Sequence, residues 1–121
     1  MSLSAATLQT VLEGRPGAVG SPLPSAPGVV LYKVMGKMFA ILTLKGEPSV
    51  IVKCDSHLVE ILREQYEGVG HRSHLDRRFW ICVTLDSDVP SDEIERLVAG
   101  SYDLIRAGLT RKQRAELDAL S

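Results

Sequence analysis

The residues best equipped for chemistry lie close together, in a stretch that holds two histidines, three arginines and the only tryptophan of the chain. Residues 70–80 read Gly-His-Arg-Ser-His-Leu-Asp-Arg-Arg-Phe-Trp. Cationic and aromatic side chains at the start of a strand offer a surface for an anionic or planar ligand. The pattern therefore predicts a binding surface, without identifying what it binds.

The two histidines raise the question of a metal site. His71 and His74 are spaced i, i+3 and can share a face, with Asp76 or Cys82 nearby. No Cys-x-x-Cys or His-Glu-x-x-His motif accompanies them, and the neighbouring arginines would repel a cation. A specific metal site needs a dedicated set of ligands. We therefore predict neither a metal nor any other cofactor.

Enzymatic activity requires a recognisable set of catalytic groups. A nucleophilic mechanism needs a serine or cysteine beside a histidine and a carboxylate. Ser73 and His74 are adjacent in the sequence, but adjacent residues of an extended chain point apart. The chain holds no nucleophile elbow and no phosphate-binding glycine loop. The sequence therefore predicts a non-catalytic protein.

Basic residues in and around the predicted strands favour a nucleic-acid ligand instead. Lys37 and Lys45 fall at turns, and three arginines precede the strand that follows. Lysine and arginine neutralise phosphates, and the indole of Trp80 can stack on an unpaired base. The leading hypothesis is a DNA-binding module that uses a basic and aromatic sheet face and its turns. Its predicted binding residues are Lys37, Lys45, Arg72, His74, Arg77, Arg78 and Trp80.

Alternatives to this hypothesis remain open. Lysines on exposed strands also discourage edge-to-edge pairing of sheets, and Trp80 can instead pack beneath a loop with its N–H bonded to backbone. The same surface can also serve a non-catalytic module that binds a protein partner or an anionic small ligand. A large apolar patch on the open sheet face would favour the protein partner. A concave pocket around His74 and Trp80 would favour the small ligand.

Composition and charge place the chain among ordinary globular proteins. Its 121 residues are 45% hydrophobic, which is typical of a single domain, here 1–121, that folds without a disulfide or a metal. The net charge of −1 does not itself favour nucleic acid, since binders of nucleic acid are usually basic. Residues 1–82 carry nine Lys/Arg and seven Asp/Glu, whereas residues 83–121 carry five and eight. A mildly basic sheet half and an acidic C-terminal half are therefore expected.

The cysteines and the lack of a long apolar run predict the cellular compartment of the protein. Two cysteines and no signal peptide favour a reducing, cytoplasmic compartment. Cys54 and Cys82 fall in predicted strands and are expected to be buried free thiols. No apolar run approaches the ~20 residues that span a bilayer, so no membrane association is expected. We expect a monomer.

Hydrophobic periodicity predicts an α+β fold. A helix ending at Gly14 is followed by a segment, 15–28, whose prolines allow only an edge strand. The β-rich runs 29–34, 38–44 and 49–54 are joined by short turns, which predicts an antiparallel meander. A helix begins at residue 55 or 56, a fourth strand covers 78–85, and two more helices begin at Ser91 and after Thr110. This order predicts helices packed on one face of an antiparallel sheet.

The same patterns predict the core. Alternation in the fourth strand turns one set of side chains to the core and leaves Trp80 on the open face. The helix from Ser91 has a core stripe at helical spacing, so Ser101 and Tyr102 are expected to serve in packing. The predicted core residues of these two elements are Phe79, Ile81, Val83, Leu85, Ile94, Leu97, Val98, Ser101, Tyr102 and Ile105.

Several short motifs in a fixed order resemble the MmcQ/YjbR family. They include Val34-Met-Gly-Lys-Met-Phe, Tyr66-Glu-Gly-Val, His74-Leu-Asp-Arg and Ser101-Tyr-Asp-Leu-Ile, and the resemblance spans about residues 16–114. It implies a small bacterial cytoplasmic protein of frataxin-like (CyaY-like) fold that binds DNA through a double-wing arrangement. Iron binding does not carry over from the fold, because the first helix has one acidic residue, Glu13, where frataxins have several.

Overall fold

The computed structural model describes residues 4–71 and 73–120, and within them it contains four helices and one six-stranded sheet. All neighbouring strands are antiparallel, in the order β1-β2-β3-β4-β6-β5. The predicted α+β class is therefore confirmed. The elements along the chain are α1 (Ala5–Glu13), β1 (Ala18–Pro22), β2 (Val29–Val34), β3 (Lys37–Thr43), β4 (Ser49–Lys53), α2 (Ser56–Gln65), β5 (Val69–Gly70), β6 (Trp80–Thr84), α3 (Ser91–Ala107) and α4 (Arg111–Asp118).

Short turns make β2, β3 and β4 successive neighbours, as the meander prediction requires. The turn between β2 and β3 places Met35 at φ 49° and Gly36 at φ 80°. Two successive positive φ values are the signature of the tightest hairpin turns, because this twist matches that of the flanking strands. The proline-containing β1 occupies the edge of the sheet, where a missing N–H does no harm.

The helices begin at the capping residues expected from the sequence. Asp55 accepts a hydrogen bond from the N–H of His57 at the start of α2. Thr110 and Gln113 form the reciprocal capping box that opens α4. At the end of α1, Gly14 adopts a right-handed φ of −77°. The glycine therefore terminates the helix as predicted, without the left-handed conformation that closes many helices.

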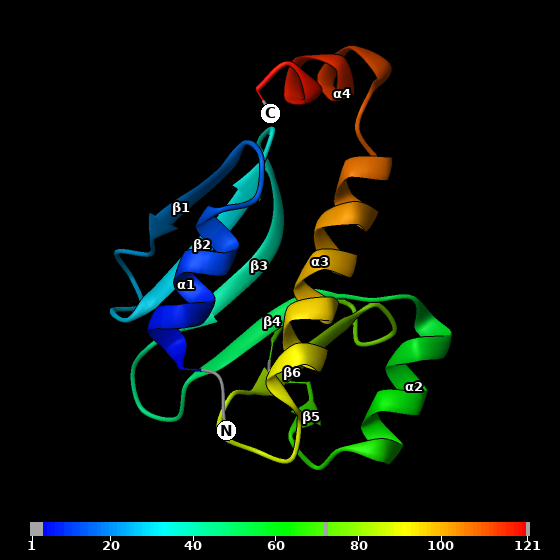
Figure 1. Ribbon diagram of the computed structural model, residues 1–121. Coiled ribbons are helices and arrows are strands. Elements are labelled where there is room, and N and C mark those ends of the chain that lie inside the picture. Colours follow the sequence, from blue (N-terminus) through cyan, green and yellow to red (C-terminus); the bar gives the residue numbers. More distant parts are fainter. Residues whose placement is uncertain (1–3, 72, 121) are drawn as a thin grey trace.

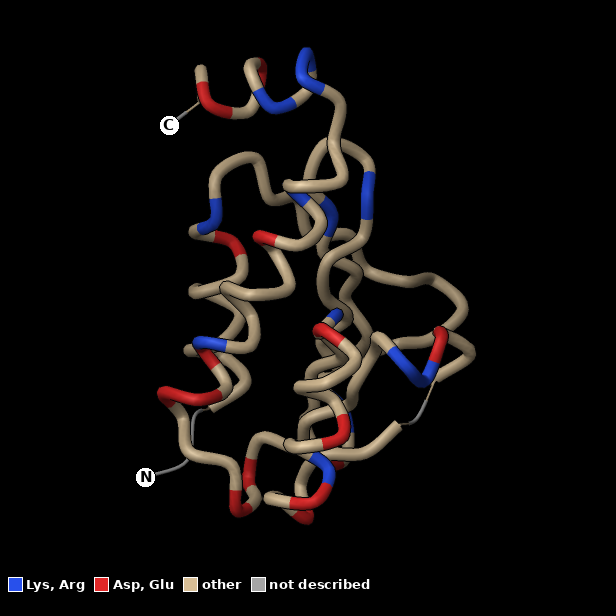
Figure 2. The backbone as a smooth tube through the Cα atoms, turned by 90° about the vertical axis from the view of Figure 1, so that its right-hand side faces the viewer, with Lys and Arg blue, Asp and Glu red and all other residues tan. Residues whose placement is uncertain are grey.

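The helices pack against one face of the sheet, which confirms the predicted layering (Figure 1). Helices α1 and α3 lie across the meander strands, and α2 reaches the β5–β6 end of the sheet through Val59 and Leu62. On β4 and β6 the side chains that face the helices are Val50, Val52, Ile81 and Val83. Figure 2 shows α3 on one side of the sheet and the loop between β5 and β6 projecting on the other.

The C-terminal helix is held at one end of the molecule by a close approach to the chain around Gly17. This glycine has a φ of 71°, and a Cβ added there would collide with the Leu117 side chain of α4. Leu117 is fully buried. A glycine is needed here both for its backbone conformation and for the space it leaves.

Two sequence predictions near β6 need correction. The strand begins at Trp80, because residues before it form a turn in which the N–H groups of Phe79 and Trp80 both donate to the carbonyl of Asp76. Phe79 therefore leaves the alternating pattern and is 36% exposed rather than in the core. The two-residue strand β5 was also not predicted, since two residues are too few to show an alternation.

None of the helices in the described part of the chain is both long and apolar enough to cross a bilayer.

Candidate binding surface on the open face of the sheet

A continuous row of apolar side chains crosses the face of the sheet that the helices leave uncovered. The strand register pairs Leu31 with Ile41, Ile41 with Ile51 and Ile51 with Cys82. The residues that alternate with them, such as Val52 and Ile81, belong to the helix-covered core, so this row points the other way. The open face of an antiparallel sheet is usually polar. A row of this kind therefore needs an explanation.

Two loops border the row and turn it into a hollow of about 760 Å³. This volume lies within the roughly 300–1,000 Å³ typical of ligand sites. One wall comes from the loop between β1 and β2, and the other from the loop between β5 and β6. No lysine or arginine of the described ranges 4–71 and 73–120 lines it. Its lining residues are Leu23, Ala26, Val29, Leu31, Met38, Ile41, Thr43, Ile51, Ser73, His74 and Leu75.

The loop between β5 and β6 covers only part of the row. Ile51 and Cys82 are 8% and 4% exposed, although both lie outside the helix-covered core. Leu31 and Ile41 are only half-buried. The covered part therefore lies on β4 and β6, and the apolar side chains of β2 and β3 stay accessible.

Internal hydrogen bonds shape this loop. The ring Nε2–H of His71 donates to the carbonyl oxygen of Leu75 at 2.7 Å, and the N–H of Leu75 donates to Ser73 Oγ at 3.2 Å. The arrangement separates the two histidines, because His71 is turned to the loop backbone while His74 is exposed at the rim of the hollow. Within the described residues, no three His, Cys, Asp or Glu side chains are grouped as metal ligands.

Two arginines, Arg78 of the loop and Arg63 of α2, make polar contacts with this loop. Arg78 forms an ion pair with Asp76 at 2.8 Å, and the guanidinium lies 5.3 Å from the centre of the Phe79 ring. The hydrogen bonds from Arg78 lower the pKa of Asp76 to about 2, so the carboxylate stays charged and balances the arginine. The guanidinium of Arg63 donates to the carbonyl of Arg77 at 3.1 Å and ties the loop to α2.

The structure does not bring the predicted nucleic-acid-binding residues to one place. Lys37 begins β3 and Lys45 follows its end, so the two lie roughly 25 Å apart at about 3.3 Å per residue. Arg77 and Arg78 line a separate hollow of about 340 Å³ beside Arg63 and other residues of α2.

The remaining predicted residues lie elsewhere. His74 stands at the rim of the open-face hollow. Trp80 is half-buried, pairs with Lys53 across β4 and β6, and is absent from the lining of that hollow. Arg72 lies outside the described residues. The predicted set is therefore divided among at least three regions of the molecule.

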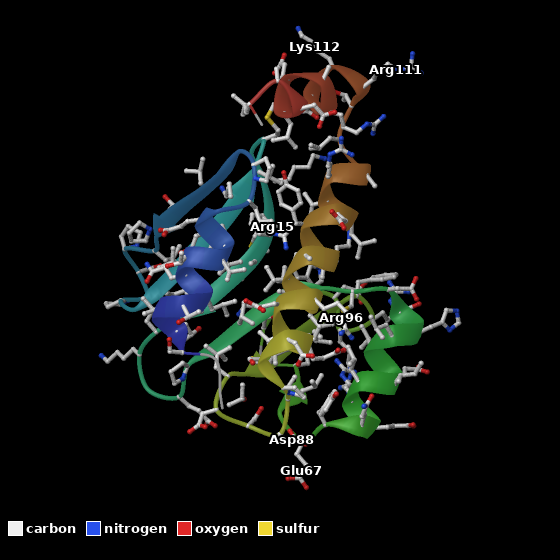
Figure 3. The ribbon with its side chains drawn as sticks, in the orientation of Figure 1. Arg15, Glu67, Asp88, Arg96, Arg111 and Lys112 are labelled. Carbon is white, nitrogen blue, oxygen red and sulfur yellow. The ribbon has the colours of Figure 1, made fainter. Side chains whose placement is uncertain are left out.

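Two acidic residues and two basic residues mark opposite ends of the molecule. Figure 3 places Glu67 and Asp88 at the end remote from Arg111 and Lys112 of α4. Asp88 has a structural task there, since its carboxylate accepts from the N–H groups of Glu67 and Gly68, both at 2.8 Å. These hydrogen bonds lower the pKa of Asp88.

Both cysteines are buried free thiols, which confirms the sequence prediction. Cys82 belongs to the apolar row and Cys54 follows β4. Burial raises the pKa of Cys54 to about 11, which suits an inert structural thiol.

Sequence reasoning missed the apolar character of the open face. The signal was present in β2 and β4, which read Val-Val-Leu-Tyr-Lys-Val and Ser-Val-Ile-Val-Lys. Runs that are apolar at successive positions are typical of strands covered on both faces. Lys37 and Lys45 at the turns favoured the prediction of a basic surface instead.

Comparison with known proteins settles the family. The family model named YjbR matches residues 14–104. The chain belongs to the YjbR family. The Escherichia coli K12 member, described as "Uncharacterized protein YjbR", is 35% identical over 71 residues, which are 58% of this chain and 60% of that protein. The match thus spans less than two thirds of the relative's length.

Solved structures share the fold. The crystal structure of Deinococcus radiodurans protein DR2400, a DUF419 domain, has a TM-score of 0.84 at 28% identity and covers 95% of this chain and 88% of its own. A Pseudomonas syringae protein has a TM-score of 0.74 at 19% identity, over 84% of this chain and 98% of its own. At that identity the second likeness shows the fold alone. The names of these proteins state no reaction.

Proposed function

We propose that this protein is a non-catalytic binding module that holds the apolar face of a partner protein in its open-face hollow. The observation that carries the proposal is the row Leu31–Ile41–Ile51, which stays partly accessible on a sheet face that lacks a helix among the described residues. Apolar surface of this kind marks an interaction site when it is contiguous and bordered by polar residues.

The dimensions of the hollow suit an amphipathic helix. Its floor spans the three strands β2, β3 and β4, which is about 10 Å at the usual strand spacing. Along β3 the floor runs from Met38 to Thr43, or about 17 Å at 3.3 Å per residue. A helix about 10 Å wide and three turns long fills such a space. It would cover this face as α3 covers the other.

The charge distribution gives the other candidate ligands less support. An anionic ligand requires cations at the site, and the described lining of the hollow supplies only His74. DNA binding, which the family resemblance implies, has Lys37 and Lys45 at turns in its favour. These lysines stand at opposite ends of β3, and Asp76 balances the charge of Arg78. A phosphate backbone would meet scattered cations rather than a continuous stripe.

Selection from a peptide library tests the proposal. A phage-displayed library is enriched on the wild-type protein, and the selected peptides are assayed against Ile41→Lys, which puts a charge in the centre of the row. The matched control is Ile61→Lys, at a 56% exposed position on α2 outside the hollow. We expect peptides with apolar residues at i, i+3, i+4 and i+7 that bind wild type and the control but lose about tenfold or more in affinity for Ile41→Lys.

Two results contradict the proposal. One is enrichment of peptides that bind Ile41→Lys as well as they bind wild type. The other is the absence of any enriched peptide together with salt-dependent binding of a labelled DNA duplex or single strand that weakens in Lys37→Ala and Lys45→Ala. The second result would establish the nucleic-acid function instead. Thermal melts confirm that each variant remains folded.

A further inference from the structure

A second apolar groove lies between α2 and α3, away from the open sheet face. It has a volume of about 530 Å³. Figure 3 shows Arg96 on the side of α3 that faces α2. Leu58 and Leu104 in its lining are 38% and 42% exposed, so apolar surface reaches solvent here. The lining residues are Lys53, Cys54, Asp55, Leu58, Glu93, Arg96, Leu97, Gly100, Asp103 and Leu104.

Gly100 in this groove has no explanation within the chain. It stands inside the 17-residue helix α3, where glycine costs about 1 kcal/mol relative to alanine. Its φ is not in the left-handed region, and outside its chain neighbours and the local helix backbone no described atom lies within 4 Å of a Cβ added there. Neither backbone conformation nor internal packing therefore requires a glycine. A glycine on a helix surface does allow another helix to approach its backbone closely.

The α3 residues in the groove are arranged symmetrically about Gly100. Arg96 precedes the glycine by four residues and Leu104 follows it by four, while Leu97 and Asp103 are three residues away on either side. If a second α3 crosses antiparallel at Gly100, Arg96 of one copy comes beside Asp103 and Leu104 of the other. The two-fold axis repeats this contact, as in any isologous dimer.

We propose that the groove between α2 and α3 is occupied by α3 of a second copy of this chain, crossing antiparallel at Gly100. Charge complementarity supports this occupant, because Arg96 of each copy comes beside Asp103 of the other. Arg96 already contacts Glu93 at 2.6 Å but its side chain is 70% exposed. A guanidinium has five N–H donors, so it can bind Asp103 of the other copy as well. The proposed dimer differs from the monomer that we expected at the sequence level.

A charge swap followed by sedimentation equilibrium tests the dimer. Wild type is expected to show a concentration-dependent monomer–dimer equilibrium. Arg96→Asp and Asp103→Arg should each raise the dissociation constant about tenfold or more, because like charges then face each other twice. The double variant should return the constant to near the wild-type value. Glu95→Arg on the exposed side of α3, outside the groove, is the matched control and should leave the constant unchanged.

Gly100→Ala separates an interface role from a role in folding. The methyl group removes the glycine cost in α3, so the melting temperature of dilute, monomeric protein should rise by a few degrees. The same methyl group obstructs the helix crossing, so the dimer should weaken. A role confined to folding cannot produce both effects together. A wild type that stays monomeric at high concentration, or a dimer indifferent to all four groove variants, overturns the proposal.

Discussion

Ser101 Oγ donates a hydrogen bond to the carbonyl oxygen of Phe39 at 2.6 Å, and so joins the middle of α3 to β3. The same oxygen accepts the N–H of Lys53 at 2.9 Å, which adds β4 to the link. The next residue, Tyr102, donates from its hydroxyl to the carbonyl of Pro16 at 2.6 Å. This pair belongs to a motif through which the chain resembles its family, and its role is structural, as predicted.

Replacing Ser101 by alanine should lower the free energy of unfolding by about 1–3 kcal/mol, since a buried carbonyl and a partly buried N–H lose their partner. Urea denaturation monitored by circular dichroism measures the change. Ser21→Ala on the exposed edge strand β1 serves as control and should change stability by less than about 0.5 kcal/mol. An equally small effect at Ser101 would show that the link is dispensable.

Trp80 and His74 should respond differently to truncation. Trp80 is half-buried, so Trp80→Ala should cost about 1–3 kcal/mol, less than the 3–5 kcal/mol of a fully buried aromatic. His74 is exposed, and His74→Ala should leave the melting temperature nearly unchanged. Thermal melts of the two variants check this. If the melting temperature of His74→Ala falls by several degrees, the histidine stabilises the loop and does not merely lie at the rim of the hollow.

The fold was largely predictable because its local signals agree with one another. The boundaries of β2 were predicted to the residue, and the capping box at Thr110 and Gln113 is present as expected. The core stripe of α3 is buried throughout, from Ile94 to Ile105. Each of these features depends on contacts within a few residues or on a simple period, which a sequence displays directly.

The candidate surface was less predictable because it depends on what lies opposite each strand. Alternation placed Trp80 on the open face correctly, but it could not reveal that Ser73, His74 and Leu75 of the loop between β5 and β6 border the apolar row. The hydrogen bond from His71 to Leu75 that shapes the loop is a tertiary detail without a sequence signature. Likewise, the sequence alone could not predict a role for Gly100, because that role depends on the groove beside it.

The carboxyl group of Asp76 should titrate with a midpoint near 2 in the folded protein. The hydrogen bonds from Arg78 favour the charged form, so the interaction contributes above the ordinary pKa of 3.8 and is lost as the pH falls through 2. Carbonyl chemical shifts measured against pH give the midpoint. In Arg78→Ala the midpoint should move up towards 3.8, and a wild-type midpoint already at 3.8 would exclude the ion pair in solution.

Cys54 should resist alkylation in the native protein at neutral pH. The reactive species is the thiolate, and burial raises the pKa of this thiol from 9.0 to about 11. In Cys82→Ala, which retains Cys54 alone, labelling should be slow at pH 7 and complete in denaturant. The preference for the neutral thiol stabilises the fold below pH 9 and is lost as the pH rises through 11. Rapid labelling at pH 7 in buffer would show that the site is open.

Strand β4 forms part of both proposed surfaces. Ile51 lies in the floor of the open-face hollow, Lys53 lines the groove between α2 and α3, and the N–H of Lys53 donates to Ser101 on α3. Binding at either surface should therefore change the chemical shift of the Lys53 amide proton. A single cross-peak in a heteronuclear spectrum can thus follow a peptide titration and a dilution series on the same labelled sample.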